Sequence, residues 1–98
     1  MLEIIHSSSF SKWLSKLADR QAVARIQVRI RRMSLGTLGD IKLVGEGVSE
    51  ARIDYGPGYR LYFVRRGLLV IVLLCGGTKG TQQKDIARAI EIANDWRD

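Results

Sequence analysis

The chain has few of the residues on which several common kinds of protein chemistry depend. Its 98 residues include one cysteine, one histidine and one proline. A single cysteine excludes an internal disulfide and a multi-cysteine zinc site. The lone His6 leaves too few parts for a serine-histidine-aspartate triad or a multi-histidine metal site. The sequence therefore predicts neither a metal nor a cofactor.

Long hydrophobic segments are also missing. The longest uninterrupted apolar run, residues 68–75, is far shorter than the roughly 20 residues that span a bilayer. Residues 1–10 have no basic start and no long apolar stretch, so a signal peptide is not expected. Because the chain is also short, we expect one domain over residues 1–98, in a reducing cytoplasm and not in a membrane.

Acidic residues are scarce in one region only. Residues 10–33 hold seven basic residues and a single acidic one, whereas the rest of the chain is balanced, so the whole net charge of +6 lies there. Such a lopsided field attracts polyanions or an acidic partner. A solvated, arginine-rich helix face is the alternative interpretation.

Apolar periodicity predicts an α+β domain. A short strand at residues 2–6 precedes two helical segments, of which the second carries a stripe of Arg25, Arg29 and Arg32 beside its apolar face. We expect these segments to form a helical hairpin. Four strands then follow, at about residues 41–44, 50–55, 59–65 and 68–75, and a last helix covers residues 81–96. The predicted fold is two N-terminal helices and a C-terminal helix packed on a mostly antiparallel sheet of four or five strands.

The segment EARIDYGPGYRLYF reads as a β-hairpin. A three-residue loop at residues 56–58 would place Asp54 opposite Arg60 and Arg52 opposite Tyr62. Arg52, Arg60 and Tyr62 would then share a polar sheet face, with the apolar residues on the other face. A solvated face with an ordinary cross-strand ion pair is the alternative.

The segment CGGTKGTQ joins the last strand to the last helix. It is not a Walker-type phosphate loop, because Lys79 precedes Gly80 and no glycine stands at the required distance upstream. Backbone amides at the helix start, with Lys79 beside them, can still receive a single phosphate. A simple strand-to-helix turn explains the same residues.

Two stretches, RIDYGPGYR and CGGTKGTQQKDI, resemble the addiction-module killer proteins of the RelE/ParE toxin superfamily, close to the HigB branch. The similarity extends over residues 4–93. It implies the toxin of a bacterial type II toxin–antitoxin pair. In the RelE branch such toxins cleave messenger RNA at the ribosome without a metal. The partners implied are the ribosome, its message and an acidic, helix-turn-helix antitoxin, for which a heterotetramer is one arrangement.

The resemblance also assigns roles to residues. Arg60 matches the sheet arginine that contacts the cleaved phosphate, Arg52 falls on the neighbouring strand, and Lys79 stands near a late basic residue that assists the leaving group. These three are the predicted catalytic residues. Further RNA contacts are expected from Arg25, Arg29, Arg32, Tyr55, Tyr62 and Lys84.

Relatives in the RelE branch carry a tyrosine or histidine late in the chain for proton transfer, and this sequence has neither there. Lys79, Lys84 and Tyr55 are the candidates for that role. The ParE branch uses the same fold to inhibit DNA gyrase without cleaving RNA, and an inactive antitoxin-binding homologue is a third possibility.

Overall fold

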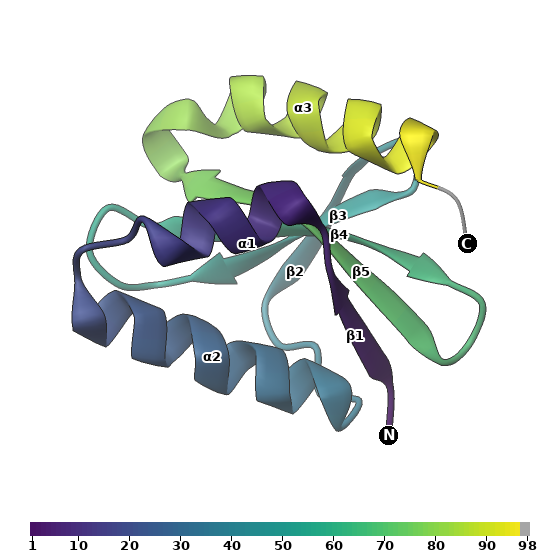
Figure 1. Ribbon diagram of the computed structural model, residues 1–98, viewed down its shortest axis with the longest axis horizontal. Coiled ribbons are helices and arrows are strands. Elements are labelled where there is room, and N and C mark those ends of the chain that lie inside the picture. Colours follow the sequence, from purple (N-terminus) through teal and green to yellow (C-terminus); the bar gives the residue numbers. More distant parts are fainter. Residues whose placement is uncertain (97–98) are drawn as a thin grey trace.

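The computed structural model describes residues 1–96, and Figure 1 shows a five-stranded sheet with three α-helices. In chain order the elements are β1 (Glu3–His6), α1 (Ser8–Ser15), α2 (Arg20–Ser34), β2 (Ile41–Gly45), β3 (Val48–Ile53), β4 (Tyr59–Arg66), β5 (Val70–Thr78), the 3-10 turn η1 (Lys79–Thr81) and α3 (Gln82–Asp95). None of the helices in this described part is long and apolar enough to cross a bilayer.

The strands lie in the order β1-β5-β4-β3-β2. β1 runs parallel to β5, and the other neighbours are antiparallel. The α+β class and the mostly antiparallel sheet are therefore confirmed. The predicted helical hairpin is wrong as an arrangement. After β1, the strand expected at residues 2–6, α1 and α2 carry the chain from one edge of the sheet to the other and pack on the sheet more than on each other.

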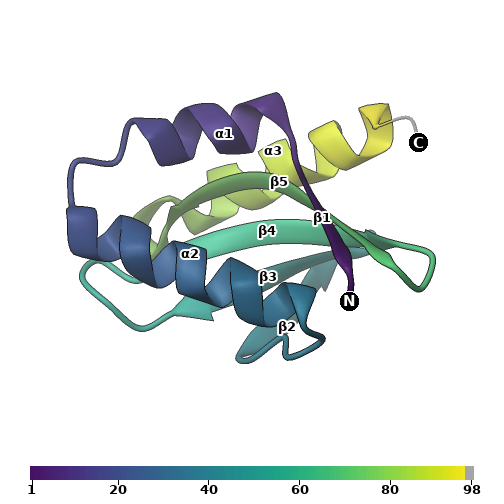
Figure 2. The same ribbon diagram turned by 60° about the horizontal axis from the view of Figure 1, so that its bottom comes forward.

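Helices cover both faces of the sheet, as Figure 2 shows, with α1 and α2 on one side and α3 on the other. Phe10 and Ile26 pack with Phe63 in the core on the first side. Ala89 of α3 packs with Tyr62 in the core on the second side. The alternation of β4 divides its side chains between these two cores.

Short polar side chains fix where the first two helices begin. The Ser7 hydroxyl accepts a hydrogen bond from the Phe10 amide and donates one to the Leu74 carbonyl, which ties the start of α1 to β5. Asp19 caps α2 by accepting from the amides of Gln21 and Ala22. Each cap satisfies backbone donors that have no partner inside the helix.

The strand predicted at residues 68–75 is displaced. Leu68 and Leu69 are exposed in a turn, and β5 extends through both glycines to Thr78. A Cβ at Gly76 would overlap the Trp13 ring on α1, and a Cβ at Gly77 would overlap the Asp85 carboxylate on α3. The glycine pair therefore exists because helices approach the strand closely from both sides. It does not form a phosphate loop.

A β-bulge interrupts the pairing of β4 with β5. Tyr62 pairs with Cys75 while Phe63 pairs with Leu73, so Leu74 is an extra residue in β5. Leu74 and Cys75 consequently both face the α3 side of the sheet. The bulge thus determines the face of the sheet on which each of the last residues of β5 lies.

We expect Gly76→Ala to lower the free energy of unfolding by about 1–3 kcal/mol, because the added methyl group must displace the Trp13 ring. Urea denaturation measures this loss. Gly80→Ala is the matched control, since its Cβ would have only an ordinary contact with Thr78. The control should stay within about 0.5 kcal/mol of the wild type. Equal losses in the two variants would contradict the close approach at Gly76.

Candidate functional site

The β3–β4 hairpin has a longer connection than predicted. Ile53 pairs with Tyr59 and Arg52 with Arg60, so residues 54–58 form a five-residue loop. The predicted three-residue loop is wrong, and so are the expected pairings of Asp54 with Arg60 and Arg52 with Tyr62. The actual register differs from the expected one by two residues. Since side chains alternate with a period of two, the assignment of residues to faces is unchanged.

The polar face of the hairpin is not a solvated surface. α3 covers part of it, and Tyr62 is fully buried. The expected contact of Tyr62 with RNA is therefore wrong, because nothing outside the protein reaches its ring. Among residues 1–96 its hydroxyl has no hydrogen-bond partner. Burial, followed by the nearby Glu50 charge, raises the pKa of Tyr62, which keeps the phenol neutral.

A buried carboxylate, Glu50, lies next to the two arginines of this face. Its Oε1 atom accepts a hydrogen bond of 2.8 Å from Arg52 Nε and lies 3.9 Å from Arg60 Nε. Gln82, in the first turn of α3, donates to both oxygens of Glu50, at 3.2 and 2.9 Å. Glu50 is fully buried, whereas the side chains of Arg52 and Arg60 are 36% and 11% exposed. Glu50 therefore compensates the charge of two guanidinium groups that face each other across the strands.

Most of the Nη donors of Arg52 and Arg60 have no partner in the part of the chain that the structure describes and are available to a ligand. Arg52 is anchored through Nε, and the one hydrogen bond of Arg60 within the described residues runs from Nη1 to the Tyr59 carbonyl, at 3.3 Å. The hydrogen bond to Glu50 raises the pKa of Arg52. Arg52 therefore remains a cation whose Nη atoms are free donors.

Arg52, Arg60 and Lys79 line one pocket at the end of the hairpin, which we call the hairpin pocket and which encloses about 400 Å³. Gly58 brings two of them together. Its carbonyl accepts from the Lys79 amide at 2.8 Å, and a Cβ at this position would lie 3.4 Å from both Arg60 Nη1 and the Lys79 Cβ atom. With φ at +81°, Gly58 also has a backbone conformation that favours glycine. The three residues predicted to be catalytic thus surround a common space.

The hairpin pocket also contains two carboxylates, of which the sequence singled out only Asp54, as a partner of Arg60. Asp40, from the loop before β2, and Asp54, from the hairpin loop, line it together with the three cations. Lys84 does not line it. Lys84 lies in a neighbouring pocket at the start of α3, about 520 Å³ in volume, which shares Lys79 with the hairpin pocket. We call this neighbour the α3 pocket.

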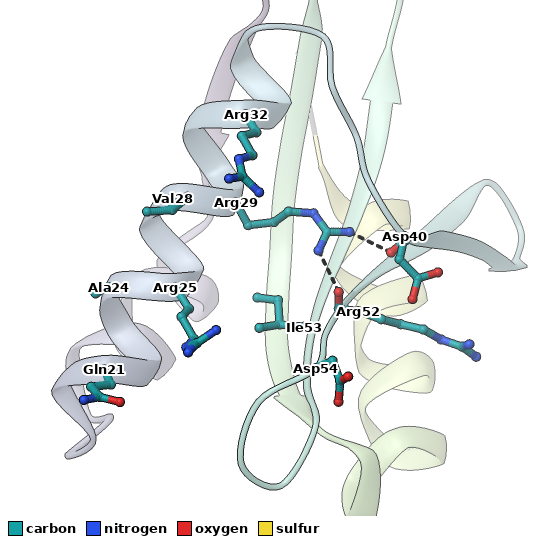
Figure 3. Close-up of a pocket in the computed structure, with 10 residues that line it drawn as sticks. All are labelled: Gln21, Ala24, Arg25, Val28, Arg29, Arg32, Asp40, Arg52, Ile53 and Asp54. Carbon is teal, nitrogen blue, oxygen red and sulfur yellow. Dashed lines mark hydrogen bonds between the residues drawn. The ribbon is translucent and has the colours of Figure 1, made fainter.

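A larger groove of about 680 Å³ runs between α2 and β3, and Figure 3 shows its lining. This α2–β3 groove contains the predicted arginine stripe. The Arg29 guanidinium nevertheless binds within the protein. It donates hydrogen bonds to the carbonyls of Leu38, Arg52 and Asp40 at 3.0, 2.6 and 2.7 Å. Its expected role in gripping RNA is therefore corrected to that of a clamp, which fixes α2 to the opposite wall of the groove.

Tyr55 lies against the beginning of α2. Its hydroxyl lies 3.1 Å from an Asp19 carboxylate oxygen, to which it donates, and the Arg25 guanidinium sits 4.5 Å from the centre of its ring. The hydroxyl is thus occupied outside the hairpin pocket, whose lining does not include Tyr55. Of the three candidates for proton transfer, only Lys79 lines the hairpin pocket together with Arg52 and Arg60.

Cys75 lies beneath α3 and is 6% exposed. Its thiol faces the Asp85 carbonyl at 3.6 Å. Burial, followed by the Asp85 charge, raises the pKa of Cys75 to about 12. A thiol held neutral in this way is a small hydrophobic residue and not a nucleophile. Within residues 1–96, no three His, Cys, Asp or Glu side chains are grouped so as to hold a metal ion.

Sequence reasoning missed Glu50, Gln82 and Asp40. Glu50 stands two residues before Arg52, and that spacing on a strand was the one available signal. Gln82 could not be found in the same way, because its contact depends on where α3 packs on the sheet.

No known protein-family model matches the chain. A protein of Haemophilus influenzae, strain Rd, is 45% identical to it over 94 residues. The similarity covers 96% of this chain and 95% of the relative, whose description reads "uncharacterized protein".

We expect Glu50→Gln to lower the free energy of unfolding by about 3 kcal/mol. The loss is at the low end of the range for removing one partner of a buried ion pair, because Arg52 is partly exposed. Urea denaturation monitored by circular dichroism measures it. Glu46→Gln, in the exposed turn between β2 and β3, is the control and should change stability little. A Glu50→Gln variant as stable as the wild type would show that the carboxylate is not needed between the two arginines.

We expect the Cys75 thiol of the folded protein to react with a disulfide reagent at pH 8 more than about 100-fold more slowly than in urea. Because folding raises this pKa, the neutral thiol adds stability below about pH 9, and that contribution is lost as the pH rises toward 12. The difference in unfolding free energy between wild type and Cys75→Ala should therefore shrink over this range. Fast labelling of the native chain at pH 8 would be inconsistent with the burial of the thiol.

Proposed function

We propose that this protein cleaves messenger RNA on the ribosome, as the toxin of a bacterial toxin–antitoxin pair. The chain belongs to the same family as the Haemophilus influenzae protein. Because that relative's description names no activity, the proposal is argued from the site itself. The proposal includes a RelE-like fold and membership of the RelE/ParE superfamily, close to the HigB branch. These follow from the resemblance of the hairpin and the CGGTKGTQ segment to that superfamily.

One observation carries the proposal: Arg52, Arg60 and Lys79 line a common pocket, and Glu50 behind them accepts a hydrogen bond from Arg52 and lies 3.9 Å from Arg60. Three positive side chains around one small space suit a phosphate group. The open side of the pocket gives a polynucleotide access to it.

The chemistry requires no metal. The 2′-oxygen of the message attacks the neighbouring phosphorus, and a bond from phosphorus to this oxygen forms while the bond to the 5′-oxygen breaks. The products are a 2′,3′-cyclic phosphate and a free 5′-hydroxyl. Negative charge grows on the phosphoryl oxygens in the transition state, where the Nη donors of Arg52 and Arg60 stabilise it.

Two protons move in this reaction, and the pocket holds both a proton donor and proton acceptors. The Lys79 ammonium donates a proton to the leaving 5′-oxygen. Asp40 and Asp54 are the lining carboxylates, either of which is able to accept the proton of the 2′-hydroxyl. An acid and a base in one pocket replace the late tyrosine or histidine of the RelE-like relatives.

The same charge distribution supports the proposed partners. The net charge of +6 favours binding to ribosomal RNA and to an acidic antitoxin encoded beside the toxin. Arg25 and Arg32 of α2, together with Lys84 at the start of α3, lie in the groove and pocket that flank the hairpin pocket. An antitoxin that covers this side neutralises the toxin by blocking the message.

Translation in a cell-free extract, followed by primer extension on the message, tests the proposal. We expect wild-type protein to produce cuts that require ribosomes, and Arg60→Ala to reduce cleavage at least about 100-fold, because one donor to the developing charge is lost. Arg65→Ala is the matched control. Arg65 is exposed on the same strand but at its other end, and cleavage should be unchanged.

Two results would contradict the nuclease. The first is an intact message together with inhibited DNA supercoiling, which would indicate a gyrase inhibitor. The second is equal activity in the wild type and Arg60→Ala, which would remove the pocket from the mechanism.

A further inference from the structure

The α2–β3 groove and the hairpin pocket adjoin each other at the end of β3. They share four lining residues, namely Asp40, Arg52, Ile53 and Asp54. Figure 3 shows these residues on one side of the groove, with the Arg52 side chain directed away from α2, and the arginines of α2 on the other side. A group bound in the groove therefore lies next to a group bound between the two sheet arginines.

The groove has the size and chemistry of a nucleoside site. Its volume of about 680 Å³ is in the range of small-molecule pockets. Val28 projects from α2 with 51% of its surface exposed, and Ile53 lies on the opposite wall. The Arg32 side chain has no hydrogen bond or ion pair within residues 1–96, while Arg25 is held in place on the Tyr55 ring. Guanidinium planes are surfaces on which unpaired bases stack.

The walls of the groove are fixed before anything binds. The Arg29 guanidinium joins α2 to the backbone of the loop before β2 and to that of β3 through three hydrogen bonds. A Cβ at Gly39 would lie 2.8 Å from Arg29 Nε, so the loop fits closely around this clamp. A preformed site loses less entropy when a ligand binds.

We propose that the α2–β3 groove binds the nucleoside on the 5′ side of the cleaved bond, so that α2 contacts the message directly. This inference rests on the proposed function and adds to it the direction in which RNA crosses the site. The attacking 2′-hydroxyl belongs to the 5′ nucleoside, so it lies where the groove meets the hairpin pocket. Asp40 and Asp54 stand at that junction.

The opposite end of the pocket is consistent with the same direction. Lys79 does not line the α2–β3 groove, and it is shared instead with the α3 pocket. The leaving 5′-oxygen belongs to the nucleotide on the 3′ side. That nucleotide therefore lies over the α3 pocket, where Lys84 faces its next phosphate.

An acidic protein segment is the other occupant that the charge of the groove allows. RNA is favoured because the groove adjoins a pocket for a single phosphate, at a junction where Asp40 and Asp54 are hydrogen-bond acceptors. The same carboxylates accept hydrogen bonds from a ribose hydroxyl.

Amide chemical shifts of the full chain, recorded during titrations, test the inference with two matched probes. Dimethyl phosphate supplies a diester without nucleosides, and a dinucleoside monophosphate with a 2′-deoxy sugar supplies the same diester with them and cannot be cleaved. We expect dimethyl phosphate to shift residues 58–60 and 79. The dinucleotide should also shift residues 25–32 and bind about tenfold more tightly.

Substitutions on α2 separate the groove from the phosphate contact. Arg32→Ala and Val28→Asp should each weaken dinucleotide binding about tenfold and leave dimethyl phosphate binding unchanged. Arg31→Ala is the control, because Arg31 is exposed on the same helix turn but does not line the groove. It should leave both affinities near wild type.

Several results would overturn the inference. They are dinucleotide shifts confined to residues 58–60 and 79, equal effects of Arg31→Ala and Arg32→Ala, no binding of the dinucleotide, or tighter binding of a short acidic peptide in the groove. Failure of the proposed function looks different. In that case Arg60→Ala leaves dimethyl phosphate binding unchanged, while the dinucleotide still shifts residues 25–32.

Discussion

Arg52 and Arg60 stand opposite each other on neighbouring strands, and the Glu50 carboxylate lies buried beside both. Without the carboxylate, two like charges would face each other at a cost to folding. With it, the Nε atoms turn inward and the Nη atoms remain available at the pocket. Gln82 holds the other side of the carboxylate, so the start of α3 is part of the same assembly. The proposed phosphate site thus depends on a residue that the ligand never touches.

The sequence predicted the faces of the hairpin better than its register. Alternation depends on parity alone, and an error of two residues in the Arg52–Arg60 pairing left that parity intact. Turn length was harder to predict, because the five-residue loop depends on how Tyr55 packs against α2. The element order and the mostly antiparallel sheet could be predicted because the periodicity that indicates each element is encoded over a few residues.

The errors share a physical cause, which is contact between segments far apart in the chain. Tyr62 alternates correctly, yet α3 covers it. Arg29 belongs to a basic stripe, yet three carbonyls from other segments occupy it. The glycines of residues 76–77 suggested a flexible turn, but Trp13 and Asp85 account for them. In each case the sequence indicated the type and orientation of the residue, but it did not indicate the distant segment that contacts it.

The bulge in β5 has a consequence for how this family can vary. Leu74 is the extra residue, and the bulge absorbs it, so that Cys75 still shares a face of the sheet with its partner Tyr62. Losing Leu74 would leave Leu73 opposite Phe63 and Cys75 opposite Tyr62, so the following residues would keep their faces and Lys79 its place beside the hairpin. Relatives are therefore able to differ by this one residue without a change in the hairpin pocket.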